Sequence, residues 1–291
     1  MAKRAGNRLK RILSLTVILI LCLGLLFSVI NARVVRVEHR TVSVKGKNPD
    51  LDGLRILFVS DLKISNSRQA RQTAKMLHKM TYLNPDLIII GGDITGRNLI
   101  QRIKPLFDEN AVSETVNELC AARDQFLIGI RDLNIPIYAV YGDEDVMMES
   151  NVEGVTFLND TQTTVYYGNA SIMLKGASDF SSGLPVDKSV IDVNADYNIF
   201  IGHDPIFLDE ALNAKSWITR SLYNMALFGH YLDGQVRIGP VCLLYRKDIS
   251  EHMRSDVLDM ITIYSAGIGT EYLPVRFGTR PTAYLLEFVN K

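Results

Sequence analysis

The sequence is poor in the residues on which several classes of protein depend. Its 291 residues include only three cysteines, at positions 22, 120 and 242, which are too few and too scattered for a disulfide framework. The formal net charge is zero and no basic stripe runs through the body of the chain, which argues against nucleic acid as a partner. With 47% hydrophobic residues, the chain has instead ample material for one large core or two smaller ones.

The longest hydrophobic run lies near the N-terminus. Residues 12–30 carry no charge and are almost wholly aliphatic, and a basic tail at residues 1–11 precedes them. This run is long enough to cross a bilayer as a helix, and longer than the apolar core of an ordinary signal peptide. We expect an uncleaved transmembrane anchor in a lipid bilayer; the alternative is a cleavable signal that ends at Ile30-Asn31-Ala32. The positive-inside rule predicts a cytoplasmic N-terminus and an extracytoplasmic domain.

After this segment, five apolar runs lead to an acid or a histidine. The runs, each with the side chain that follows it, are 54–59 with Asp61, 86–90 with Asp93, 135–140 with Asp143, 197–201 with His203 and 225–228 with His230. Such runs are typical of strands covered on both faces, and ligands bind at the carboxyl ends of strands in open α/β sheets. Taken alone, Asp93 is only a cap of the next helix or turn. If the strands are neighbours, the five side chains form one cluster of oxygen and nitrogen ligands for a metal.

The segments between these runs predict the order of the fold. Helical spacing at 67–83 and 112–133 gives an alternation of strands and helices, and hence a mainly parallel sheet in this half. Residues 155–177 change to short β-rich pieces that are typical of hairpins in a second, more antiparallel sheet. We assign residues 31–47 to a linker and first strand, and residues 48–291 to one domain with two stacked sheets and helices outside them.

The chain resembles the calcineurin-like metallophosphoesterase superfamily in the order of its blocks: Asp61, Asp93, Gly142-Asp143, His203 and Gly229-His230. It is most similar to membrane-anchored bacterial members with a D-x-H, G-D, G-N-H-D, H-x-P and G-H-T-H-G-G-Q series. The resemblance implies a four-layer α/β/β/α sandwich of two mixed sheets. It also implies a two-metal centre, in which one aspartate bridges the ions and a bridging hydroxide attacks phosphorus. Asp93 would be the bridge and Asp61 a ligand of the first metal. His203 and His230 would hold the second, with Asp143 in the place of an asparagine ligand.

Three positions depart from this pattern, because Lys63, Glu144 and Leu232 stand where the resemblance requires histidines. A protonated lysine cannot ligate a metal, so we expect Lys63 either to replace the first metal as a fixed counter-ion to Asp61 or to extend to solvent. Glu144 and its neighbour Asp145 are the candidate catalytic residues. Glu144 is a general base only if it faces a water, and the alternative for both residues is a solvated loop charge.

The residues that remain predict the cofactor. One set of ligands, two oxygens and two nitrogens from Asp93, Asp143, His203 and His230, suits one divalent transition metal: Mn, Fe or Zn. The histidine ligands that are missing near Asp61 argue against a second metal.

Two functions follow from these residues, with a third of a different kind. The first is a membrane-anchored, metal-dependent hydrolase of a phosphoester or pyrophosphate, carried on a small molecule or on a lipid. The second is a catalytically impaired pseudoenzyme that binds a phosphorylated ligand or a protein partner, because loss of one metal shell together with the catalytic histidine costs orders of magnitude in rate. The third is a scaffolding subunit at the membrane.

Overall fold

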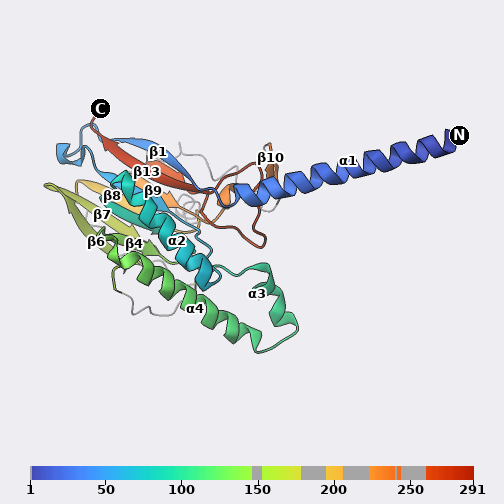
Figure 1. Cartoon of the computed structure of the whole chain (residues 1–291). Coiled ribbons are helices and arrows are strands. Elements are labelled where there is room, and N and C mark those ends of the chain that lie inside the picture. The colour runs from blue at the N-terminus through green and yellow to red at the C-terminus, as the bar shows by residue number, and fades with distance from the viewer. Residues whose placement is uncertain (1, 146–152, 178–194, 206–222, 240, 244–259) are drawn as a thin grey trace, which may run out of the picture.

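Two β-sheets packed face to face form the body of the computed structural model (Figure 1), which describes residues 2–145, 153–177, 195–205, 223–239, 241–243 and 260–291. The helices are α1 (Ala2–Asn31), α2 (Ser67–Met80), α3 (Leu99–Ile103) and α4 (Ala111–Ile130). The strands are β1 (Arg36–Ser43), β2 (Arg55–Val59), β3 (Leu87–Gly91), β4 (Ile137–Val140), β5 (Thr156–Phe157), β6 (Gln162–Tyr167), β7 (Ala170–Gly176), β8 (Tyr197–Ile201), β9 (Met225–Phe228), β10 (Arg237–Ile238), β11 (Val241–Cys242), β12 (Ile261–Tyr264) and β13 (Thr282–Val289).

The first sheet has the order β1-β13-β2-β3-β4-β5. Strands β2 to β5 are parallel, whereas β13 runs antiparallel to β2 and pairs in parallel with β1. The β1 pairing extends from Arg36 opposite Thr282 to Ser43 opposite Val289. The segment after the N-terminal helix is therefore built into the sheet along its whole strand.

The second sheet has the order β12-β9-β8-β7-β6. Strands β7, β8, β9 and β12 are parallel, and only the β6–β7 hairpin is antiparallel. A separate short hairpin joins β10 to β11. This sheet is more parallel than the β-rich pieces of the sequence predicted, and β5, expected in it, pairs with β4 in the first sheet instead.

The alternation of side chains along the central strands explains why these runs carry no polar residues. On β2, Ile56 and Phe58 point into the core between the two sheets, whereas Leu57 and Val59 belong to the core under the helices. Helices α2 and α4 cover that outer face, and Gly129 lets them approach closely, since a Cβ there would lie 2.8 Å from the Cβ of Ala74. Both faces of the strand are thus buried.

These observations confirm the predicted fold class. The protein is a mixed α/β structure with two large mixed sheets and one N-terminal apolar helix. Residues 206–222, between β8 and β9, and most of the chain between β11 and β12 lie outside the described residues, so the fourth layer of the expected sandwich is not described.

Helix α1 leaves the domain at one end (Figure 1). Residues Lys10–Asn31 are long and apolar enough to span a membrane and are almost entirely unburied, although a signal sequence near an N-terminus has the same properties. Its last turn is fastened to the domain: the Arg276 amide donates to the Ser28 carbonyl (3.0 Å), and the Asn31 side chain donates to the carbonyls of Arg276 (3.2 Å) and Thr279 (2.7 Å).

Candidate metal centre

The five strand-end side chains meet at the carboxyl ends of β2, β3, β4, β8 and β9. The donor atoms of Asp61, Asp93 and His203 lie within 4.8 Å of one another, and so do those of Asp143, His203 and His230. His203 belongs to both groups and therefore joins them. Two sheets contribute, because the aspartates follow strands of the first sheet and the histidines follow strands of the second. The neighbouring strands bring the five positions together, as the sequence pattern requires.

His203 is held in one orientation by a backbone hydrogen bond. Its Nδ1 lies 2.8 Å from the carbonyl of Gly91 and donates to it, which leaves Nε2 as the atom that faces the carboxylates. That Nε2 lies 3.1 Å from Oδ2 of Asp93 and 3.2 Å from Oδ1 of Asp143. The ring is fully buried. A backbone carbonyl that fixes the far nitrogen is the arrangement found behind histidines that ligate metals.

His230 approaches the same carboxylate from the other side. Its Nδ1 lies 3.2 Å from Oδ1 of Asp143 and 3.4 Å from Nε2 of His203. The two rings are perpendicular, with centroids 5.2 Å apart. Because Asp143 is partly exposed while His203 is buried, this side of the centre is the one open to solvent.

Asp61 carries an unsatisfied atom that points into the cluster. Its Oδ2 accepts hydrogen bonds from the hydroxyl of Ser60 (2.6 Å) and the amide of His230 (3.0 Å). Its Oδ1 is buried, has no hydrogen-bond partner among the described residues and lies 4.0 Å from Nε2 of His203. A buried carboxylate oxygen without a partner is costly, and a cation is the natural group to satisfy it. The residues present thus fit a divalent metal.

The backbone around the cluster is close and strained. Asp61, Asp93 and His230 all have left-handed φ values, of 50°, 52° and 74°. Such conformations cost of order 1–3 kcal/mol each and concentrate at functional sites. A Cβ at Gly142 would lie 2.3 Å from Oδ1 of Asp93, so only glycine permits this approach. The glycine before Asp143 is therefore required by the geometry of Asp93.

Mutual charge keeps the cluster ionised. Burial alone would lower the pKa of His203, but the carboxylates of Asp93 and Asp143 outweigh it and raise that pKa well above the ordinary value. Burial raises the pKa of Asp93, yet the charges of His203 and Lys63 bring it down to about 2. The pKa of Asp143 is also lowered, since hydrogen bonds from His203 and His230 outweigh its burial. The carboxylates are thus charged at neutral pH, and a metal that binds here displaces the proton of His203.

A family model described as calcineurin-like phosphoesterase matches residues 54–233, which include all five of these positions. The chain belongs to the calcineurin-like phosphoesterase family. Members of this family typically bind divalent metals, and this chain has candidate ligand groups that include Asp61, Asp93 and His203. A comparison with curated proteins gives no match.

Solved structures resemble the chain only distantly. A hypothetical protein from Thermus thermophilus is 15% identical, with a TM-score of 0.38 over 74% of this chain and 76% of that one. GAP50, the anchor in the inner membrane complex of Plasmodium, is also 15% identical, with a TM-score of 0.37 over 74% and 72%. A predicted phosphoesterase from Streptococcus pneumoniae is 13% identical, with a TM-score of 0.28 over 77% and 78%. These scores carry no argument about the site of this phosphoesterase-family chain.

Lys63, which replaces a family histidine, is buried and ion-paired. Its ammonium contacts Oδ2 of Asp93 and lies 3.0 Å from Oε2 of Glu271. The expectation that Lys63 extends to solvent is wrong, and the ion pairs that the structure gives are with Asp93 and Glu271 rather than with Asp61. Sequence reasoning missed Glu271, since it follows no apolar run; the one hint was that a buried lysine needs a carboxylate partner.

Glu144 also replaces a family histidine, but it is directed to two arginines. Its Oε2 accepts from Nε of Arg97 at 3.0 Å, and its Oε1 lies 3.0 Å from Arg102. Burial raises the pKa of Glu144, and these arginines together with Lys63 outweigh it and lower the pKa. The expectation of a solvated loop charge is wrong, because the carboxylate is buried in an ionic network.

Asp145 holds the turn that presents Asp143. Its carboxylate accepts from the amides of Thr95 (2.8 Å) and Gly142 (2.9 Å). Burial, with the nearby charge of Asp93, raises the pKa of Asp145 to about 6. The side chain is buried, so it is not a solvated charge either, and its bonds to the backbone give it a positioning role.

Leu232, the third replaced histidine, lies under a loop at residues 265–269. It is fully buried, and a Cβ at Gly267 would lie 2.5 Å from it. The buried guanidinium of Arg276 ties this loop down, since it donates to the carbonyls of Leu232 (3.1 Å), Ala266 (2.7 Å) and Gly269 (2.6 Å). The loop in turn contacts the centre, because the Gly269 amide donates to the Asp61 carbonyl at 2.7 Å.

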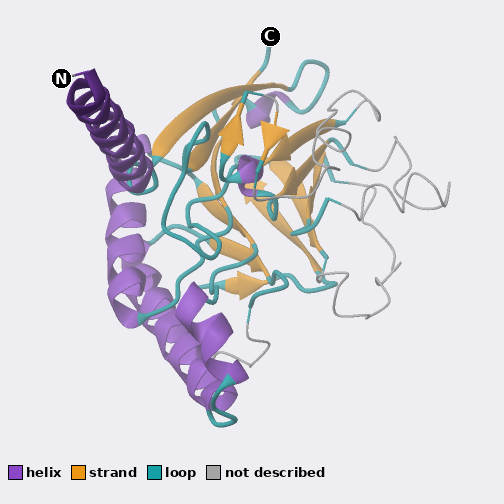
Figure 2. Cartoon of the chain, turned by 90° about the vertical axis from the view of Figure 1, so that its right-hand side faces the viewer, coloured by secondary structure: helices purple, strands orange, loops and turns teal. Residues whose placement is uncertain are grey.

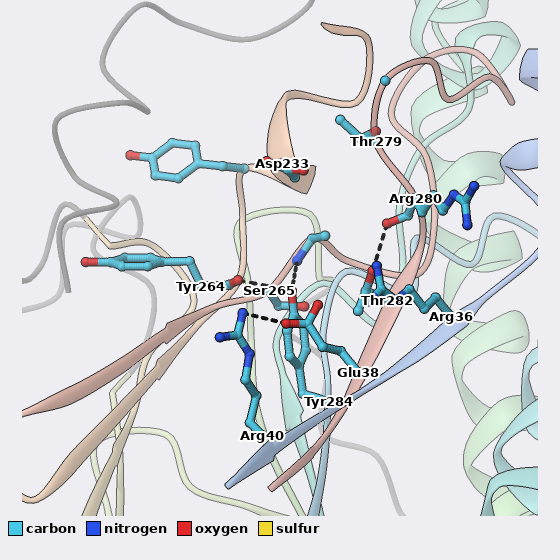
Figure 3. A pocket seen from close by; sticks show the side chains of 13 residues that line it. Arg36, Glu38, Arg40, Asp233, Tyr264, Ser265, Thr279, Arg280, Thr282 and Tyr284 are labelled. Carbon is cyan, nitrogen blue, oxygen red and sulfur yellow. Dashed lines mark hydrogen bonds and ion pairs between the residues drawn. The ribbon is translucent and has the colours of Figure 1, made fainter. Parts of the chain in front are cut away.

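A pocket of about 440 Å³ adjoins the loop that carries His230 (Figure 3). Asp233 lines it on that side. The other charged residues of its lining are Arg36, Glu38, Arg40 and Arg280, and Arg40 is ion-paired with Glu38.

Proposed function

We propose that this protein is a membrane-anchored, metal-dependent hydrolase of a phosphoester or pyrophosphate. The observation that carries the proposal is the convergence of His203 and His230 on one oxygen of Asp143, at 3.2 Å each, with Oδ2 of Asp93 3.1 Å from the same Nε2 of His203. Two imidazoles and two carboxylates suit Mn, Fe or Zn. We infer one such ion per chain, held by these four residues.

The residues of the chain prepare this centre for an anionic substrate. When bound, a divalent metal supplies charge that polarises a phosphoryl oxygen and lowers the pKa of a water. The Gly91 carbonyl keeps Nε2 of His203 directed at the carboxylates, and the ionised pair Asp93 and Asp143 supplies the negative charge that holds a cation. Asp61 adds one more oxygen without a hydrogen-bond partner in the described part of the chain.

Lys63 takes the place that the family resemblance assigned to the first metal. Its ammonium lies between Asp93 and Glu271 and supplies a fixed positive charge there. A second cation beside it would be repelled. This arrangement supports a centre with one metal and one lysine.

The position of the anchor supports a substrate carried on a lipid. Helix α1 is fastened through Arg276 to the 265–269 loop, and that loop donates to Asp61. The centre therefore lies at the end of the domain from which α1 leaves, close to where headgroups would lie if α1 spans a bilayer. The basic tail at residues 1–11 supports a cytoplasmic N-terminus and an extracytoplasmic domain, by the positive-inside rule.

The direct test is turnover of generic aryl phosphate esters by the purified full-length protein, after loading with Mn²⁺, Fe²⁺ or Zn²⁺ in turn. We expect hydrolysis of a monoester or diester that needs the metal and is abolished in His230→Ala. The matched control is His78→Ala, because His78 lies on α2 and binds the Gly129 carbonyl away from the centre. Hydrolysis that is unchanged in His230→Ala contradicts the proposal.

One observation favours a second candidate, a pseudoenzyme that binds a phosphorylated ligand or a protein partner. Glu144 is held by Arg97 and Arg102, so no acid group replaces the missing catalytic histidine at that position. A metal-loaded protein that binds inorganic phosphate or an aryl phosphate, but does not turn over any of the esters, supports this alternative over the hydrolase.

A further inference from the structure

An exposed apolar surface surrounds the end of the domain from which α1 leaves. We call it the apolar rim; its most prominent members are Ile100, Leu106, Phe107, Ile238, Leu273 and Phe277. They come from three parts of the chain: α3 with the turn that follows it, the β10–β11 hairpin, and the loop after Glu271. Contiguous exposed apolar surface of this kind marks a contact with a protein or a membrane.

Hydrogen bonds and packing join the three parts into one surface. Tyr272 pairs with Asn98 at the start of α3, and its ring lies under the guanidinium of Arg102, 4.7 Å from the centroid. Farther along the same loop, Phe277 pairs with Val236, next to β10. The loop therefore connects α3 to the hairpin.

The same loop carries the attachment of α1. The Arg276 amide donates to the Ser28 carbonyl, and the Asn31 side chain donates to the Arg276 carbonyl. Figure 1 places α3 and β10 at the end of the domain from which α1 leaves, and Figure 2 shows this end facing the viewer with α1 projecting forward. The apolar rim and the apolar helix thus lie at the same end of the domain.

We propose that the apolar rim is a second membrane contact, which inserts into the interfacial region of the same bilayer that α1 crosses. The proposal rests on the membrane anchor proposed above. A bilayer is favoured over another occupant because the rim borders a helix that is itself apolar along Lys10–Asn31. The exposed guanidinium groups of Arg33, Arg36 and Arg280 beside this junction suit anionic headgroups.

The consequence concerns the orientation of the domain. A single spanning helix leaves a domain free to tilt, whereas a second contact fixes one face against the bilayer. Because the 265–269 loop links the rim side to Asp61, the fixed face is the one that carries the candidate metal centre. The enzyme would then act on a phosphate at headgroup level without lifting the lipid out of the membrane.

The test uses the full chain in nanodiscs, with a polarity-sensitive fluorophore attached to one introduced cysteine. The background carries Cys22→Ala, Cys120→Ala and Cys242→Ser. The rim probe is Ile100→Cys, and the matched control is Tyr166→Cys, because both native side chains are 74% exposed and Tyr166 lies on β6 at the opposite end of the domain. Ile20→Cys reports on insertion of α1 itself.

We expect nitroxide-labelled lipids to remove most of the emission at positions 20 and 100 and to leave position 166 unchanged. Quenching at position 20 but not at 100 overturns the membrane contact and leaves both the anchor and the proposed hydrolase standing. Emission at position 100 that is shifted to the blue but insensitive to the lipids overturns it in favour of a second copy or a protein partner. No quenching at position 20 contradicts the anchor and this proposal with it.

Discussion

The two halves of the centre neutralise the same aspartate in different ways. On the side of Asp143, two histidines approach the carboxylates and leave a set of donors suited to a metal. On the other side, Lys63 supplies the positive charge itself, between Asp93 and Glu271. One half offers ligands for a cation from solution, and the other has a cation built into the chain.

This difference explains how the fold can lose a histidine without losing its geometry. Buried carboxylates require compensation, and either a metal or an ammonium group provides it. The lysine half therefore carries its positive charge without a metal, whereas Oδ1 of Asp61 has no hydrogen-bond partner in the described part of the chain and would be satisfied by a bound cation. The comparison makes separate predictions for metal binding and for folding.

The largest effect should come from removing His203. In metalloproteins even the loss of an outer hydrogen-bond partner costs roughly 10–100-fold in metal affinity or activity. We therefore expect His203→Ala to weaken metal binding by more than about 100-fold, measured by competition with a fluorescent chelator. The fold should survive, as checked by circular dichroism. Metal affinity equal to that of the wild type would show that the histidine half does not bind the metal.

The lysine half should respond in stability rather than in metal affinity. Lys63→Met removes a buried cation and leaves Asp93 and Glu271 with only His203 and Arg102 as ion partners; breaking a buried ion pair in this way typically costs about 3–5 kcal/mol in the free energy of unfolding. Denaturant unfolding of the full chain in detergent measures this loss. Lys104→Met is the matched control, since Lys104 is exposed and pairs with Glu114 at the surface, and we expect no measurable change there. If Lys63→Met is as stable as the wild type, the ammonium is not the compensating charge.

The smallest effect on turnover should come from Glu144. Its carboxylate is bound to Arg97 and Arg102 and does not face the histidines. Glu144→Gln should keep aryl phosphate hydrolysis within about threefold of the wild type, because general acid–base groups that act on the substrate contribute about 10²–10⁴-fold and this one does not. A drop in the initial rate of about 10²–10⁴-fold would show instead that Glu144 takes part in the reaction.

The sequence predicted the positions that follow buried strands, because an apolar run with no polar alternation determines both the strand and the edge at which it ends. Asp61 and His230 lie in contact for that reason, and the His230 amide donates to Oδ2 of Asp61. The sequence alone could not identify Glu271 or the role of Arg276, because both residues lie in a loop whose path depends on tertiary contacts. The same holds for β5, which is too short to show in which sheet it pairs.

Side-chain direction was also beyond the sequence. Glu144 follows Asp143 directly, yet the turn held by Asp145 sends its carboxylate to Arg97 instead of to the centre. The predicted ion partner of Lys63 was wrong for a similar reason. The end of β2 fixes where the backbone of Lys63 lies, but the packing of the 265–277 segment decides where its ammonium group lies.

The most direct test of this account is the number of metal ions per chain, measured by mass spectrometry of the purified full-length protein after loading with a transition metal and removal of the excess. The account predicts one ion for the wild type, one for Glu144→Gln and none for His230→Ala. Two ions in the wild type, or one ion that persists in His230→Ala, would contradict it.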